Sequence, residues 1–115
     1  MKRSRLGGAW LGLALVTLFL AVPASADPAS DLSTLFGQTN AVAFANDFTQ
    51  GERVSLVTKL IGAMESLGRG NEKTTVNHLN AFTNEVSALE QSGRLPSADA
   101  EALTDAANAI ADQLD

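Results

Sequence analysis

The stretch NHLNAFTNEVSALEQSGRLPSADAEAL, residues 77–103, decides the fold. In its first half Leu79, Phe82, Val86 and Leu89 recur at intervals of three and four residues, which places them along one side of an α-helix. Gly93 then stops that helix, and a Pro-Ser pair starts another whose first turn is acidic. The stretch therefore predicts two antiparallel helices joined by a short turn.

The same periodicity continues on both sides. Residues 51–67 repeat apolar side chains at helical spacing and end at a Gly-Arg-Gly turn, residues 71–92 form the second helix behind an Asn N-cap, and the third helix is alanine-rich. We predict an all-α fold, a small antiparallel three-helix bundle over residues 51–115, with residues 27–50 as either a short fourth helix or a strap. The predicted core consists of Val57, Leu60, Ile61, Met64, Leu79, Phe82, Val86, Leu89, Leu103 and Ile110.

The first 26 residues have the three-part pattern of a secretory signal peptide. Three basic residues precede an uncharged apolar run, residues 6–22, and Ala-Ser-Ala follows at residues 24–26. An uncleaved membrane anchor is the alternative, but the run is shorter than a bilayer span of about 20 residues. We expect cleavage after Ala26, no membrane span afterwards, and a protein that is either periplasmic or secreted from the cell.

The expected mature chain is acidic and lacks cysteine. It keeps five basic and thirteen acidic residues, a net charge of −8, because three basic residues leave with the signal peptide. This charge repels phosphate backbones and anionic lipid surfaces, so we expect no nucleic-acid partner. The sequence contains no cysteine for a disulfide or a lipid anchor, so stability has to come from apolar packing.

The sequence contains no residue pattern that points to catalysis, a metal or a cofactor. His78 is the single histidine, whereas a zinc site needs several converging ligands. A nucleophilic serine would need that histidine together with an orienting carboxylate, and the sequence has no Gly-x-Ser-x-Gly elbow. We therefore expect His78 at the margin of its helix, no catalytic residues, no metal ligands, no cofactor and no enzyme activity.

Two groups of side chains are candidate contact surfaces. Phe36, Phe44 and Phe48 lie close together in the N-terminal segment, which is too much aromatic area for a free linker. They form a candidate surface for an apolar ligand, a partner or a second copy of the chain, which leaves a homodimer open. The second group consists of Asn77, Asn80 and Asn84. These amides share the side of their helix away from the core stripe and offer both donors and acceptors to a partner.

The segments SLVTKL, SLGRGNEKTTVNHLNAFTNEVSAL and SGRLPSADAEALTDAANAI resemble the FIMAH-type helical module of bacterial secreted proteins. The resemblance covers about residues 51–114. Its matching positions are Ser55, Leu56, Lys59, Leu60, Arg69, Gly70, Asn71, Leu79, Ala81, Phe82, Asn84, Val86, Gly93, Leu95, Leu103, Ala106, Ala107 and Ile110. The resemblance implies an all-α accessory module, commonly attached to the C-terminal side of secreted enzymes and surface proteins, with no established catalytic residues to transfer.

These observations favour a secreted, non-catalytic helical interaction module whose partner is an unidentified protein or envelope component. The alternative is a small extracytoplasmic carrier that holds an apolar ligand between its helices, with the phenylalanine-rich segment as a flap. In either case Lys59 and Asn84 are candidates for polar contacts between helices. If Asn84 is buried we expect its amide to have a partner, because a buried amide without one costs about 1–3 kcal/mol.

Overall fold

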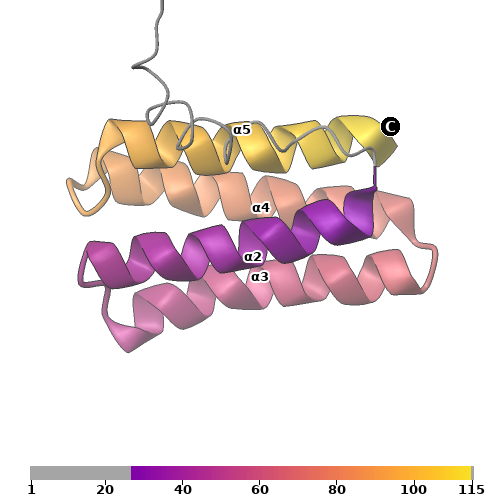
Figure 1. The fold of residues 1–115 in the computed structure, drawn as a ribbon, viewed down its shortest axis with the longest axis horizontal. Helices are drawn as coiled ribbons and strands as arrows, with labels where there is room; N and C mark the ends of the chain where they lie inside the picture. Colours follow the sequence, from indigo (N-terminus) through magenta and orange to yellow (C-terminus); the bar gives the residue numbers. More distant parts are fainter. Residues whose placement is uncertain (1–26, 115) are drawn as a thin grey trace, which may run out of the picture.

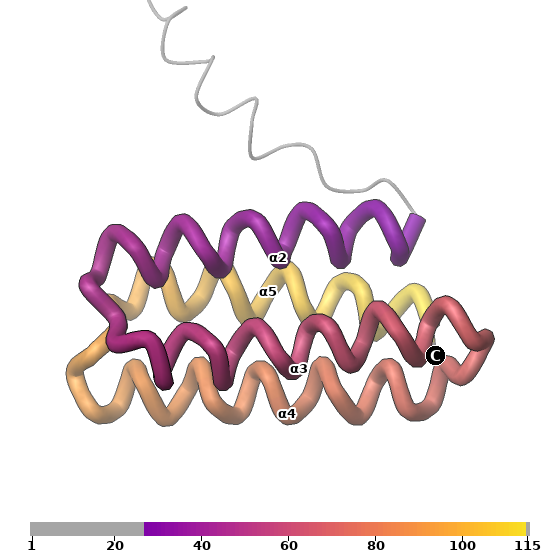
Figure 2. The backbone as a smooth tube through the Cα atoms, turned by 90° about the horizontal axis from the view of Figure 1, so that it is seen from below, coloured from indigo at the N-terminus to yellow at the C-terminus, as the bar shows by residue number. Residues whose placement is uncertain are grey.

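The computed structural model describes residues 27–114, which form four α-helices, and no strand occurs in this range. The helices are α2 (Pro28–Ala45), α3 (Gln50–Gly68), α4 (Glu72–Gln91) and α5 (Ser97–Leu114). Successive helices run antiparallel (Figure 1). Each helix packs against two others, and the ring closes because α2 lies against α5 as well as α3 (Figure 2). The all-α class is confirmed, and the predicted signal peptide lies outside the described residues.

The N-terminal segment is longer and more regular than predicted. Instead of a short helix or strap within residues 27–50, the chain forms α2, an 18-residue helix that begins behind Asp27. The Asp27 carboxylate accepts a hydrogen bond from the Ala29 backbone at 3.2 Å, and proline occupies the first helical turn. Gly37 lies inside the helix and does not interrupt it. Residues 27–114 therefore form a four-helix bundle, in which α2 is a full-length member.

The three connections between helices share one hydrogen-bond pattern. Two residues after the last residue of α2, α3 and α4 stands a residue in the left-handed region, namely Asp47 (φ 54°), Gly70 (φ 78°) and Gly93 (φ 83°). The next backbone N–H then donates to the carbonyl five residues earlier, as in a Schellman motif. These bonds are Phe48 to Ala43 at 3.0 Å, Asn71 to Ser66 at 2.9 Å and Arg94 to Leu89 at 2.9 Å. The repeated motif returns each helix alongside the preceding one.

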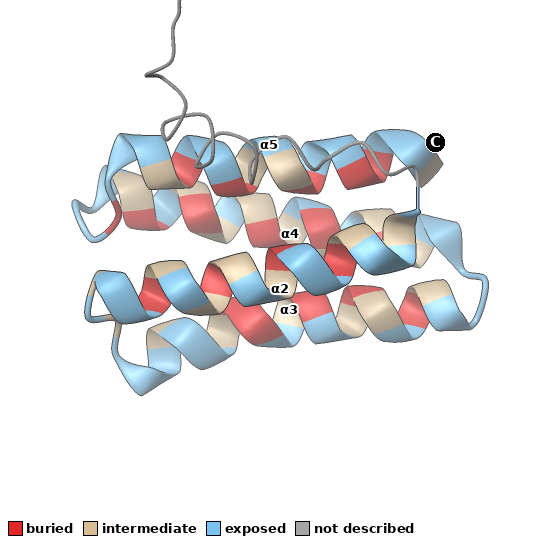
Figure 3. Cartoon of the chain, in the orientation of Figure 1, coloured by how far each residue is buried: buried red, intermediate tan, exposed pale blue. Residues whose placement is uncertain are grey.

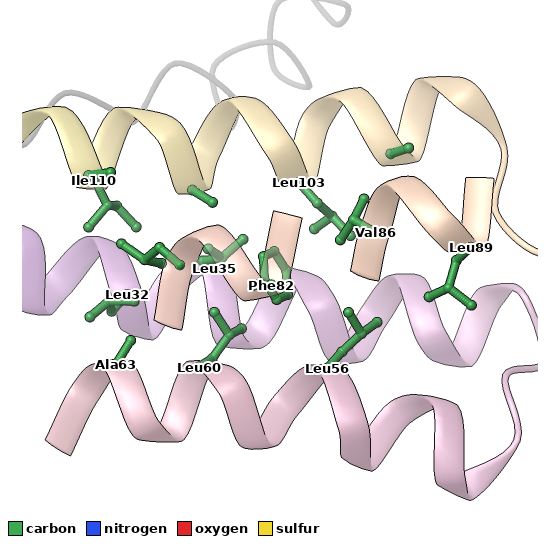
Figure 4. Close-up of a cluster of buried hydrophobic side chains, with 14 of the residues drawn as sticks. Leu32, Leu35, Leu56, Leu60, Ala63, Phe82, Val86, Leu89, Leu103 and Ile110 are labelled. Carbon is green, nitrogen blue, oxygen red and sulfur yellow. The ribbon is translucent and has the colours of Figure 1, made fainter. Parts of the chain in front are cut away.

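Side chains from all four helices meet in one apolar core. Phe82 of α4 is completely buried and lies among Leu35 of α2, Leu60 of α3 and Leu103 of α5 (Figure 4). The buried positions lie on the sides of the helices that face the bundle interior (Figure 3). The predicted core residues that the structure buries are Val57, Leu60, Leu79, Phe82, Val86, Leu89, Leu103 and Ile110.

The buried face of α3 differs from the predicted one. Ile61 was expected in the core, but it is 41 % exposed, and Met64 only packs against the edge of the core. Leu56 is completely buried instead, together with Ala63 one turn beyond Leu60. Apolar residues occupy more than one side of α3. Their spacing is therefore compatible with two rotations of the helix about its axis, each of which would bury a different face. Contact with both α2 and α4 selects the rotation that buries Leu56.

The corrected architecture predicts unequal effects of two apolar truncations. Leu35→Ala on α2 should lower the free energy of unfolding by about 2–5 kcal/mol, because the shorter side chain leaves a cavity in the core. Ile61→Ala on α3 should cost about 1 kcal/mol or less, because 41 % of its surface is exposed to water already. Urea unfolding followed by circular dichroism measures both. A small loss of unfolding free energy for Leu35→Ala would show that α2 does not contribute to the core of the bundle.

Candidate functional site

The three phenylalanines of the N-terminal segment do not share one surface. Phe36 and Phe48 are partly buried and pack against the core, whereas Phe44, near the end of α2, is 87 % exposed. The segment thus contributes two aromatic rings to the bundle and presents one to solvent. The carrier alternative requires the three phenylalanines to act together as a flap, and this arrangement separates them.

Phe44 belongs to a helix with very little charge. The sequence of α2 contains one charged residue, Asp31, whereas α3, α4 and α5 contain four each, with histidine left out of the count. Asp31 accepts a hydrogen bond from Gln113 of α5 at 2.9 Å, on the side of α2 that adjoins α5. The exposed residues of α2 that we call the α2 face are Ser33, Thr34, Gly37, Ala41, Phe44 and Ala45.

The amide group predicted as a contact surface is exposed along α4. Asn77, Asn80 and Asn84 all lie in water, on the side of the helix opposite the buried Leu79 and Phe82. The structure therefore brings the three amides onto one accessible helix face, and it places Asn84 outside the helix interface.

The polar contact between α3 and α4 uses Glu85 rather than Asn84. The Lys59 ammonium lies 2.7 Å from Oε1 of Glu85 and 3.2 Å from the hydroxyl of Ser55. Ser55 donates to the same Glu85 oxygen at 2.8 Å. Lys59 thus bridges the helices, as its candidate role required, whereas Asn84 is exposed, takes no part in this contact and does not meet the condition on which a partner was expected. Asn84 is one residue away from the position that faces α3.

His78 lies at the interface of α3 and α4, next to Gly62, a neighbour that no local sequence pattern indicates. A Cβ atom built on Gly62 would stand 2.7 Å from Cε1 of the His78 ring and 2.9 Å from Nδ1. The ring therefore occupies the space that a side chain at position 62 would need. This contact explains a glycine in the middle of α3, where alanine would favour the helix by about 1 kcal/mol.

Arg94, in the turn between α4 and α5, forms hydrogen bonds with the turn between α2 and α3 and with the start of α3. Its guanidinium donates to both Glu52 carboxylate oxygens, at 2.9 and 2.7 Å, and to the Asp47 carbonyl at 3.3 Å. The guanidinium carbon lies 5.9 Å from the centre of the Phe48 ring. Glu52 also completes a capping box with Thr49 at the start of α3. Hydrogen bonds from Arg94 first, and then from the Thr49 backbone, lower the pKa of Glu52 to about 2.

A groove of about 500 Å³ lies between α4 and α5. It is lined by Thr83, Ser87, Glu90, Ser97, Ala100, Glu101, Thr104 and Asp105. Seven of these eight residues carry a hydroxyl or a carboxylate group, so the groove is not the predominantly apolar pocket that suits an apolar ligand. The carrier alternative gains no support from it.

The described residues contain neither a cluster of metal ligands nor a helix that could cross a membrane. Between residues 27 and 114, no three histidine or acidic side chains are grouped as metal ligands would be. None of the four helices in that range combines the length and hydropathy that crossing a bilayer requires.

Comparison with protein families identifies the class of the chain. A sequence model of the FIMAH domain matches residues 32–112, from the first buried leucine of α2 into the last helix. No curated protein and no solved structure matches the chain. Because the match covers most of its length, the chain belongs to the FIMAH domain family, a helical and non-catalytic type of module of surface and secreted proteins. The resemblance at residues 51–114 is confirmed, and the match also includes most of α2.

The contact between Gly62 and His78 predicts an energetic coupling. In the parent protein Gly62→Ala should bring no gain in stability or a small loss, because the new methyl group displaces the imidazole ring. In a His78→Ala background the same substitution should stabilise by about 1 kcal/mol, the helix preference of alanine over glycine. Urea unfolding of the parent, both single variants and the double variant gives the coupling. Equal effects of Gly62→Ala in both backgrounds would contradict the contact.

The lowered pKa of Glu52 predicts a loss of stability in acid. Its pKa in the folded protein is about 2, below the ordinary value of 4.5, so between these values the unfolded chain binds more protons. This contribution to stability is present above about pH 4.5 and is lost as the pH falls toward 2. Glu52→Gln should therefore reduce the slope of unfolding free energy against pH in this window. Arg94→Gln should do the same, and the double variant should add little. A parent-like slope for Glu52→Gln would contradict the assignment.

Proposed function

We propose that this chain is a non-catalytic interaction module that acts outside the cytoplasm and contacts its partner through the α2 face. The observation that carries the proposal is the exposure of Phe44, which is 87 % accessible on the helix with the fewest charges. Family membership supports the general role, because FIMAH domains are a non-catalytic type of module of surface and secreted proteins.

Physical reasoning supports a contact at Phe44. A phenylalanine left in water forgoes roughly 2–3 kcal/mol that burial would supply. Exposed aromatic side chains on surfaces of low charge are typical anchors of protein interfaces, which are depleted of charge at the core and polar at the rim. Val54 and Ile61 are also exposed, but both lie on α3, whose sequence contains four charged residues. Among the large exposed apolar side chains, Phe44 therefore has the surroundings best suited to a partner.

The extracytoplasmic location rests on the N-terminal sequence. Residues 1–26 have the charge, apolar run and small-residue site of a signal peptide. The expected partner is a protein or envelope component that remains to be identified by experiment, and a second copy of the chain is one such partner. The acidic charge of the mature chain disfavours nucleic acid and anionic lipid.

Site-specific photo-cross-linking in the producing cells tests this function. A benzophenone side chain in place of Phe44 should give cross-linked adducts, whereas the same group in place of Asn108, an exposed position on α5, should give few. The recovered protein should have the mass of a chain that begins at Asp27. Absence of adducts at position 44, or equal adducts at both positions, would contradict the α2 face as the contact surface. A mass that includes residues 1–26 would contradict cleavage.

A further inference from the structure

Resting on the proposed function, we propose that the partner of the α2 face is a second copy of the same chain, with the two α2 helices packed antiparallel. The inference concerns the residues around Gly37, Ala41 and Phe44, which are all exposed. It depends on three features of this face: a glycine without a neighbour, a neutral surface on an acidic protein, and a self-complementary order of side-chain sizes.

The first feature is the glycine in the middle of α2. Glycine within a helix is destabilising relative to alanine, so it needs a compensating contact. Gly62 has such a contact in the His78 ring. For Gly37, the described residues place no side chain or neighbouring backbone within 4 Å of where a Cβ would stand. If the backbone of a helix from another molecule packed closely against position 37, the absence of a side chain there would have a structural reason.

The second feature is charge. Two copies of a chain with a mature net charge of −8 repel each other over most of their surfaces. On α5 the exposed residues include Glu101, Asp105 and Asp112, so two α5 helices would bring carboxylates together. The α2 face carries no charge, and Asp31 is engaged by α5 at the side of the helix. The α2 face and the row of amides on α4 are both surfaces that a second copy can approach with little repulsion, and of the two only the α2 face presents a large exposed apolar side chain.

The third feature is the order of side-chain sizes along α2. An antiparallel pair with its two-fold axis at the level of residue 39 places a small residue opposite a small one and the large ring opposite a short side chain. The facing positions are Gly37 with Ala41, Ser33 with Ala45, and Thr34 with Phe44. A two-fold interface requires this kind of self-complementarity. A single helix pair is a small interface, so the dimer should be concentration-dependent.

Cysteine pairs provide a direct test, because the chain contains no cysteine of its own. Ser33→Cys and Ala45→Cys are made as separate variants of the exported protein. In the proposed register two copies of the same variant hold their thiols about 18 Å apart, from the 1.5 Å rise per residue. That exceeds the reach of a disulfide, whose Cα atoms lie within about 7 Å. An equimolar mixture under mild oxidation should form the mixed disulfide, and neither variant alone should form its own.

A second substitution links the disulfide to Phe44. Adding Phe44→Lys to both cysteine variants should reduce the yield of mixed disulfide by about tenfold or more, because it places two cations in the interface. Ile61→Lys, which alters an exposed apolar residue on α3, should leave the yield unchanged. Circular dichroism checks that both lysine variants remain folded.

Three outcomes would overturn the dimer. They are no mixed disulfide, equal disulfide formation by each variant alone, and a yield that Phe44→Lys does not change. If position 44 cross-links in cells to a different protein while the purified mixture forms no mixed disulfide, the dimer is wrong but the proposed interaction function stands. If position 44 gives no adduct of any kind in cells, the proposed function fails as well.

Discussion

The burial of one aromatic ring is the constraint on which the rest of the bundle depends. Phe82 has no exposed surface, and a ring of this size can be removed from water only if apolar side chains approach it from several directions. Leu35, Leu60 and Leu103 supply those directions from the other three helices (Figure 4). A chain without cysteine cannot replace such packing with a disulfide, so α2 is needed to complete the core.

The turns show what the sequence could and could not predict about the fold. Gly70 and Gly93 identified the ends of α3 and α4, because glycine adopts the left-handed conformation at little cost. The end of α2 uses Asp47 in the same conformation, so it gave no glycine signal. Gly37, although glycine disfavours a helix interior, lies inside a continuous helix. The same motif was thus recognised twice and missed once, which is why α2 was predicted as a short helix or strap.

For the candidate surfaces, too, the sequence was sufficient to place some residues and not others. The spacing of Asn77, Asn80 and Asn84 was sufficient to place them on one helix face, because that follows from the helical period alone. The separation of Phe44 from Phe36 and Phe48 depends on which side of α2 meets the core, and that could not be read before α2 was known to be a helix. Contacts between distant residues, such as Arg94 with Glu52, leave no local pattern in the sequence.

Native-state hydrogen exchange resolved by residue is the most direct test of the claim that α2 belongs to the bundle. If all four helices form one core, the slowest amides of α2, around Leu35 and Thr39, should open with the same free energy as those around Phe82 in α4. Both sets should lose protection together as denaturant is added. Rapid exchange throughout α2, with α3, α4 and α5 still protected, would contradict the account and leave a three-helix module with a loosely attached N-terminal segment.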